Sequence, residues 1–216
     1  MTVYRAAATA GAVLVSACVG SRTPSHPVLR LEAPARVCAE RATSFFGGTA
    51  LEDREAWYSS QLRAAKEGAL CRLPDDTGSV YRFTWIPSFN PTVVVRVESG
   101  ANGYRITAKS LSGAGGYEPG SLAHMTTYEL DDADMEKFAE LLTAARFWEL
   151  PTDPPPDGTE GADGAQWVLE GLENGRYHVV DRWSPRPDGP DAAYRRLGEW
   201  LLTRSSLAPS SLVKEY

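Results

Sequence analysis

The stretch that decides the fold is Gln166–Trp183, which reads QWVLEGLE-NG-RYHVVDRW. Asn174-Gly175 separates two runs rich in apolar and aromatic residues, and this dipeptide is the strongest short signal for a two-residue hairpin loop. A loop of that length fixes the strand register, so residue 173 faces 176 and residue 169 faces 180. The sequence therefore predicts an antiparallel hairpin over 166–173 and 176–183.

The predicted register divides the hairpin's side chains between two faces, because side chains alternate along a strand. One face carries Trp167, Leu169, Gly171, His178, Val180 and Arg182. The other carries Gln166, Val168, Glu170, Leu172, Tyr177, Val179, Asp181 and Trp183.

Glu170 and Asp181 are diagonal neighbours on the second face, within about 7–8 Å at the backbone. Two carboxylates on a partly apolar face can act as general acid and base if burial raises the pKa of one. The alternative, which we favour, is an ordinary amphipathic face that is exposed to solvent, or arginines that pair with both carboxylates. These two residues are the candidate catalytic groups.

The segments outside this hairpin add strands and helices. Alternating runs predict strands at 81–85, 93–98, 104–111 and 122–129, with the second and third joined through a loop at 99–103. Helical spacing predicts helices at 51–69, after a capping box at Thr49–Glu52, at 130–145, capped by Asp131, and at 191–204. A short helix is expected within 36–47. Without βαβ alternation, the predicted class is α+β, with an antiparallel sheet and two helices in the C-terminal half.

The N-terminus resembles a bacterial lipoprotein signal. Arg5 precedes a short apolar run, too short to span a bilayer, and the run ends in Val15-Ser16-Ala17-Cys18. In lipoproteins of this type the cysteine thiol receives a diacylglyceryl group and residues 1–17 are removed. The alternatives are an ordinary secretion signal cut near Ala17, or a cytosolic start. Val19, rather than Asp, favours the outer membrane by analogy with enteric bacteria.

Two cysteines then remain, Cys38 and Cys71. In an oxidising compartment such a pair is read as a disulfide, which would staple the N-terminal helical segment to the fold. The expected organisation is a signal peptide at 1–17, a flexible tether at 18–35, one α+β domain at 36–204 and a tail at 205–216.

Composition and spacing exclude several classes of function. The chain has 216 residues, a formal net charge of −6 and 43% hydrophobic residues, so it suits a packed domain and not a nucleic-acid binder. No zinc spacing occurs among His26, His124 and His178, and the acidic loop at 151–165 does not match an EF-hand. The glycine-rich segment 113–120 lacks a phosphate-loop ending, so we expect it to be a turn-forming connector. We therefore expect no metal and no cofactor.

Five of the six tryptophans are considered as ligand contacts, and most of them are assigned to packing. A few of them can line a groove for an apolar or carbohydrate-like ligand. The five are Trp85, Trp148, Trp167, Trp183 and Trp200.

Several phrases resemble a family of uncharacterised bacterial exported proteins. They are VYRFTW at 80–85, GGYEPG at 115–120, FWELP at 147–151, DGAQW at 163–167 and YHVVDRWSP at 177–185. The resemblance covers about residues 50–204 and implies export but no activity, ligand or catalytic residue.

The leading expectation is a lipid-anchored envelope protein on the periplasmic side of the outer membrane, acting as a non-catalytic binding or accessory module. Its membrane partner is the bilayer that holds the lipid on Cys18. The alternatives are an envelope hydrolase that uses Glu170 and Asp181, and an inhibitor or immunity-type protein.

Overall fold

A computed structural model describes residues 45–46, 51, 53–74, 77–101, 103–154 and 163–208 of the chain. The described strands are β1 (Val80–Pro87), β2 (Val93–Gly100), β3 (Gly103–Leu111), β4 (Leu122–Leu130), β5 (Ala165–Glu173) and β6 (Arg176–Trp183). The helices are α1 (Glu55–Ala64), α2 (Asp132–Ala144) and α3 (Ala192–Ser205), with short 3-10 turns η1 (Leu70–Arg72) and η2 (Phe147–Glu149).

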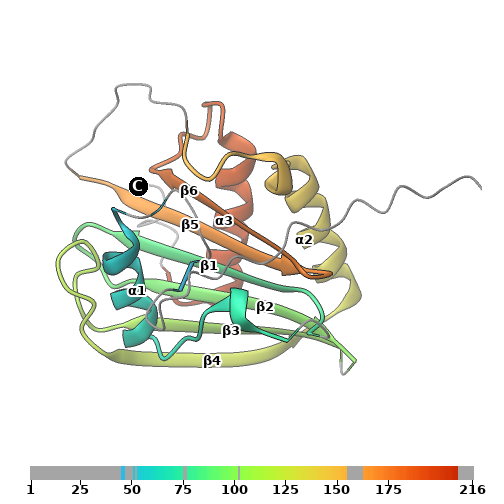
Figure 1. Cartoon of the computed structure of the whole chain (residues 1–216), viewed down its shortest axis with the longest axis horizontal. Helices are drawn as coiled ribbons and strands as arrows, with labels where there is room; N and C mark the ends of the chain where they lie inside the picture. The colour runs from blue at the N-terminus through green and yellow to red at the C-terminus, as the bar shows by residue number, and fades with distance from the viewer. Residues whose placement is uncertain are drawn as a thin grey trace, which may run out of the picture. The chain divides into compact units, whose positions relative to one another are not determined.

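The six strands form one antiparallel sheet in the order β4-β3-β2-β1-β5-β6 (Figure 1). The predicted register of the last hairpin is confirmed, because Glu173 faces Arg176 and Leu169 faces Val180. Asn174 and Gly175 both have positive φ, at 49° and 76°, as a two-residue hairpin loop requires. The prediction of an α+β fold with an antiparallel sheet is therefore confirmed.

Helices α2 and α3 cover the sheet face that carries Trp167 and Leu169 (Figure 1). Their apolar stripes meet the aromatic side chains of β1 and β5 in the larger hydrophobic core. Gly198 allows α3 to approach closely, because a Cβ there would lie 2.6 Å from the indole of Trp167. Asp131 caps α2 as predicted, with its Oδ1 accepting from the Asp134 amide at 2.8 Å.

Helix α1 covers the opposite face, which carries Glu170 and Asp181. Leu62 and Tyr58 of α1 belong with Val168 and Val179 to a second hydrophobic core. The expectation that this face lies open to solvent is therefore wrong, since both carboxylates are fully buried. The other expectation, that arginines pair with both carboxylates, is confirmed, because Arg82 contacts Glu170 and Arg54 contacts Asp181. Sequence periodicity could not assign α1 to this face, because an amphipathic helix packs on any sheet face that offers apolar area.

Two predicted boundaries differ from the structure. Helix α1 spans 55–64 rather than 51–69, because Lys66 takes a left-handed conformation with φ of 53° and turns Glu67 toward the sheet. The loop between β2 and β3 is shorter than predicted, because the ladder continues to the pair Gly100 and Gly103.

Several predictions lie outside the described residues. These are the signal peptide, Cys18, the tether, most of the 36–47 helix, the Cys38 half of the disulfide, His26 and the distal part of the tail. Cys71 is buried, and its Sγ lies 3.8 Å from the carbonyl oxygen of Phe45. Within the described part of the chain, no helix combines the length and the apolar character needed to cross a bilayer.

Candidate functional site

A cavity of about 260 Å³ lies at the end of β1, on the face covered by α1. Its walls come from four parts of the chain: the exposed side of α1, the end of β1, the glycine-rich segment and the end of β6. Three of the side chains are aromatic. The lining residues are Trp57, Ile86, Ser88, Gly116, Tyr117 and Trp183, and we call this cavity the aromatic pocket.

Tyr117 is held over the aromatic pocket by the glycine-rich segment 113–120. Its side chain is 74% exposed, and its ring lies 5.8 Å from the ring of Phe89, which is itself 53% exposed. Two large aromatic rings in solvent are costly for a soluble domain, and such patches mark binding surfaces. The pair therefore identifies this rim as a candidate contact surface.

Backbone hydrogen bonds hold the glycine-rich segment against the end of β1. The amides of Gly115 and Gly116 donate to the carbonyls of Asn90 and Pro87 at 2.9 and 3.0 Å. Gln61 of α1 donates through Nε2 to the Gly115 carbonyl at 2.8 Å. At Gly116 a Cβ would lie 2.8 Å from the backbone of Ser88, so only glycine fits without a shift. The segment is a close-packed support for Tyr117.

Trp183 forms the opposite wall of the pocket. The backbone of Gly164 lies against its indole, and a Cβ on Gly164 would lie 2.5 Å from Cζ2 of the ring. Ser88 Oγ donates to the Gly164 carbonyl at 3.0 Å and accepts from its amide at 3.1 Å. These contacts fix the position of Trp183 relative to the end of β1.

Gln166 supplies an unpaired polar group beside the pocket. In the sheet register it stands between Ile86 of β1 and Trp183 of β6, both of which line the pocket. Its side chain is only 8% exposed, yet its Oε1 has no hydrogen-bond partner among the described residues. A buried acceptor without a donor costs about 1–3 kcal/mol, so a polar partner is expected to satisfy it.

Asp181 lies two residues before Trp183 on the same sheet face and is fully buried. Tyr58 donates to its Oδ2 at 2.6 Å, and the Arg54 guanidinium lies 2.9 Å from the same oxygen and also pairs with Asp153. Oδ1 has no partner among the described residues. Burial raises the pKa of Asp181 to about 6, although Tyr58 and Arg54 act to lower that pKa.

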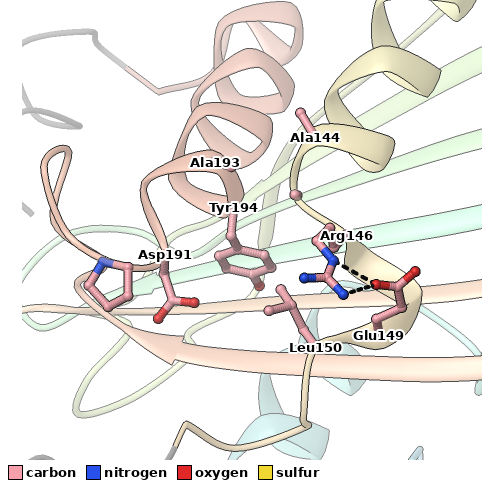
Figure 2. Close-up of a pocket in the computed structure, with 9 residues that line it drawn as sticks. Ala144, Arg146, Glu149, Leu150, Asp191, Ala193 and Tyr194 are labelled. Carbon is pink, nitrogen blue, oxygen red and sulfur yellow. Dashed lines mark hydrogen bonds and ion pairs between the residues drawn. The ribbon is translucent and has the colours of Figure 1, made fainter.

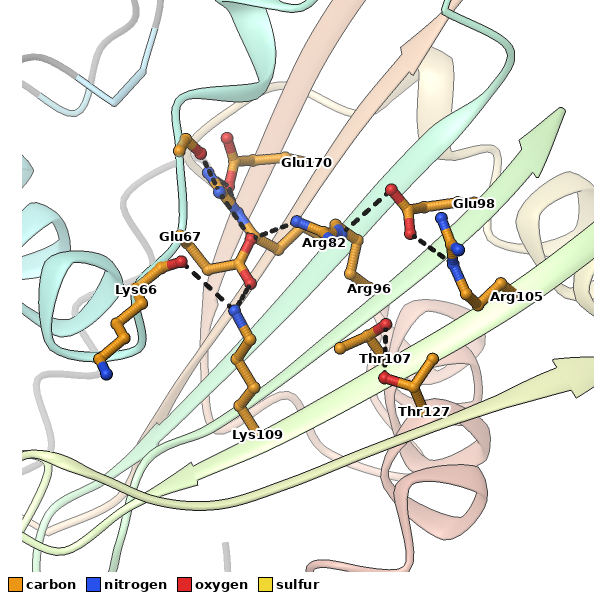
Figure 3. Close-up of polar contacts among 11 residues, drawn as sticks. Lys66, Glu67, Arg82, Arg96, Glu98, Arg105, Thr107, Lys109, Thr127 and Glu170 are labelled. Atoms are coloured by element: carbon orange, nitrogen blue, oxygen red, sulfur yellow. Dashed lines mark hydrogen bonds and ion pairs between the residues drawn. The ribbon is translucent and has the colours of Figure 1, made fainter.

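Glu170 belongs to a different network, which it shares with Arg82 and Glu67 (Figure 3). Its Oε2 accepts from Nε of Arg82 at 2.7 Å, and its Oε1 accepts from Tyr177 at 2.9 Å. Burial nevertheless raises the pKa of this carboxyl above its ordinary value.

Glu67 extends this network across the sheet (Figure 3). It enters from the turn after α1 and contacts Arg82 at 3.5 Å, Arg96 at 3.0 Å and Lys109 at 2.5 Å. Burial acts to raise the pKa of Glu67, but the three cations outweigh it and the pKa is lowered. Each buried carboxylate here has its counter-ions, so the arrangement is suited to joining α1 to the sheet.

A second cavity, of about 280 Å³, opens on the other side of the molecule between α2, η2 and α3 (Figure 2). Arg146 and Glu149 on its rim pair with each other, and Asp191 pairs with Arg182 at 3.1 Å. Its charged groups therefore already have partners, and it offers less to a ligand than the aromatic pocket.

The structure brings Glu170 and Asp181 to one face, as the register predicted, but neither of them lines a described cavity. His178 is half-buried on the face covered by α2 and α3, where its Nε2 donates to the Leu150 carbonyl at 2.9 Å. His124 is exposed on β4. Among the described residues no cluster of ligands could hold a metal ion.

The sequence named Trp183 only as one of five tryptophans of which a few could line a groove, and it did not point to Trp57, Tyr117 or Gln166. The one available signal was a lone tyrosine inside a glycine-rich connector. Trp85 and Trp167 are core residues as predicted, and Trp148 and Trp200 pack at the edge of the same core.

A comparison with known protein families finds no family model that matches the chain, and a comparison with curated proteins finds no match either.

Proposed function

We propose that the protein is a non-catalytic binding module of the bacterial cell envelope, and that the aromatic pocket is its binding site. The observation that carries this proposal is the exposed Tyr117–Phe89 pair on a close-packed glycine support, beside a buried acceptor that lacks a donor. Such a site combines apolar area with one directional polar contact, which is the usual composition of a small-ligand site.

The proposed ligand is a saccharide ring. The C–H face of a sugar offers a flat apolar surface to Trp57, Tyr117 and Trp183. Gln166 does not line the pocket and its Oε1 is buried, so a hydroxyl or acetamido N–H group would have to enter between Ile86 and Trp183 to donate to it. The pocket volume of about 260 Å³ is close to the lower end of the range for ligand sites, so it suits one ring of a longer glycan. Glycans of this kind are abundant in the compartment to which the N-terminal signal would send the chain.

The envelope location rests on the sequence. Residues 15–18 match the lipoprotein pattern, and the resemblance to exported proteins agrees with it. Two or three acyl chains on Cys18 would give stable membrane anchoring, whereas one would not. A Cys38–Cys71 disulfide belongs to the same proposal, and alkylation of either thiol in the non-reduced mature protein would contradict it.

A hydrolase is the second candidate, favoured by the raised pKa of Asp181 and its unpaired Oδ1. A group with a pKa near neutral can serve as a general acid or base. Glu170 is poorly suited to be its partner because Arg82 and Tyr177 occupy its two oxygens. Release of reducing ends from an envelope glycan, lost in Asp181→Asn, would favour this candidate over a binding module.

Isothermal titration of the full chain with a β-1,4-linked N-acetylglucosamine tetrasaccharide tests the binding function. We expect measurable binding that Tyr117→Ala weakens about tenfold, because the exposed ring contributes contact area and nothing to the core. The matched control is Tyr128→Ala, which removes a part-exposed ring from the opposite sheet face. No binding by the wild-type chain, or equal losses in both variants, would contradict a saccharide site here.

A further inference from the structure

In the described part of the chain, β4 is an edge strand of the sheet and no other strand pairs with its outer side. Every residue from Ala123 to Glu129 is exposed, although these residues sit in a regular nine-residue strand paired only with β3. An edge strand presents unpaired amide and carbonyl groups, and proteins usually protect such edges with lysine, proline, bulges or a covering segment. Strand β4 contains neither lysine nor proline, and its register shift lies at one end, between Ser110 and Leu111 of β3.

The opposite edge, at β6, is covered by the chain itself. The Asp181 amide donates to the Thr152 carbonyl at 2.8 Å, and Arg182 donates to the carbonyls of Thr152 and Pro151 at 3.0 and 3.1 Å. The segment 151–152 thus lies along part of β6 and bonds one of its backbone amides, that of Asp181. Among the described residues no comparable segment is bonded to the backbone of β4 on its outer side.

Strand β4 is complementary to a second copy of itself. Antiparallel pairing over the whole strand places Thr126 opposite Thr126 of the second copy, Met125 opposite Thr127 and His124 opposite Tyr128. Glu129 then faces Ala123, so no like charges are opposed. Threonine pairs and aromatic pairs across strands are favourable, and the register keeps each pair on one face of the joined sheet.

We propose that the protein forms a homodimer by antiparallel pairing of β4 with β4 of a second copy, centred on Thr126. The dimer would join two six-stranded sheets into one continuous sheet and satisfy the open edge. This inference does not depend on what the aromatic pocket binds, because none of the residues that line that pocket belongs to β4.

Sedimentation velocity of the full chain in mild detergent, over a concentration series, tests the proposal with Thr126→Lys and Thr126→Glu. Each substitution alone opposes like charges at the dimer axis, and we expect the dissociation constant of the dimer to rise at least tenfold. An equimolar mixture of the two variants should dimerise again, because lysine then faces glutamate. The matched control is Thr143→Lys, at an exposed position of α2, which should dimerise like the wild type.

Restoration by the mixture excludes misfolding as the cause of the loss, since a misfolded chain would not pair again. A monomeric wild-type chain at all concentrations overturns the proposal. A dimer that Thr126→Lys and Thr126→Glu leave intact overturns it as well, because the contact would then lie elsewhere.

Discussion

At the scale of single residues, the buried ion pairs on the sheet face beneath α1 matter most for the stability of the fold. Arg82 is fully buried and contacts both Glu170 and Glu67, while its NH1 donates to the Gly68 carbonyl at 2.5 Å. One cation therefore balances two buried carboxylates and also fixes the turn after α1. Removing one member of such a network leaves a charge without its partner in a poorly solvated site.

Arg82→Met is expected to destabilise the fold by about 3–5 kcal/mol, because Glu170 loses its counter-ion. Urea unfolding measures the change. Arg105→Met is the matched control, since Arg105 is exposed and pairs only with Glu98 at the surface, where such pairs contribute about 0–1 kcal/mol. Equal losses in the two variants would show that the buried network has no special role.

Asp181 predicts a pH dependence. Its pKa is about 6 in the fold against an ordinary 3.8, so the folded state binds the proton more tightly and the free energy of unfolding falls as pH rises through that interval. Asp181→Asn lacks this titration. The free energy of unfolding of the variant should therefore rise relative to that of the wild type between pH 4 and pH 8, by at most about 3 kcal/mol. Urea unfolding at both pH values measures the gap, and a gap that is independent of pH would contradict the raised pKa.

The placement of Glu170 and Asp181 could be predicted from the sequence because a two-residue loop leaves one register. Their counter-ions could not be predicted in the same way. Arg82 lies about 90 positions upstream of Glu170, and Arg54 lies about 130 positions upstream of Asp181. Only the pairing of β1 with β5 and the packing of α1 on the sheet bring these partners together. Local patterns contain no information on which distant strands become neighbours.

At the scale of elements, the strands were predictable and the ends of α1 were not. Alternating side chains and turn residues define β2, β3, β5 and β6 within a few residues. Helix α1 ends early because Glu67 is drawn to three cations on the sheet, which is a tertiary contact. The glycine-rich segment also differs from its predicted role as a plain connector, because it supports Tyr117 over a pocket.

Gly116→Ala tests whether that support matters. The added Cβ would overlap the backbone of Ser88, so the segment must shift, and we expect tetrasaccharide affinity to fall about as much as in Tyr117→Ala. Gly100→Ala is the matched control, because nothing lies within 4 Å of a Cβ at that position. Titration calorimetry on both variants gives the comparison. Unchanged affinity in Gly116→Ala would mean that the segment's close packing does not position Tyr117.

At the scale of the whole molecule, we propose a lipid anchor at Cys18 and, in the described part of the chain, a ligand site at the aromatic pocket and a sheet edge at β4 that pairs with a second copy. The ligand site was only partly foreseen, because its aromatic residues are dispersed over the sequence from Trp57 to Trp183. They meet only after α1, the end of β1 and the end of β6 have assembled. The anchor, in contrast, is a local signal and can be tested directly.

Cys18→Ala is expected to move the protein from the membrane fraction to the soluble fraction, because no thiol remains to receive the lipid. Fractionation of cells followed by immunodetection measures the distribution. Cys71→Ala controls for the loss of a cysteine as such and should leave the protein with the membrane. A Cys18→Ala protein that stays in the membrane fraction would place the anchor elsewhere.

We propose that the aromatic pocket is a ligand site and that its ligand reaches the unpaired Gln166 acceptor beside it. Gln166→Met separates binding from stability, because an apolar side chain of similar length removes an unsatisfied buried group and should leave the melting temperature equal or higher. The same change removes the acceptor for the ligand. Calorimetric titration of Gln166→Met with the tetrasaccharide should show at least tenfold weaker binding than the wild type, whereas wild-type affinity in this variant would contradict the account.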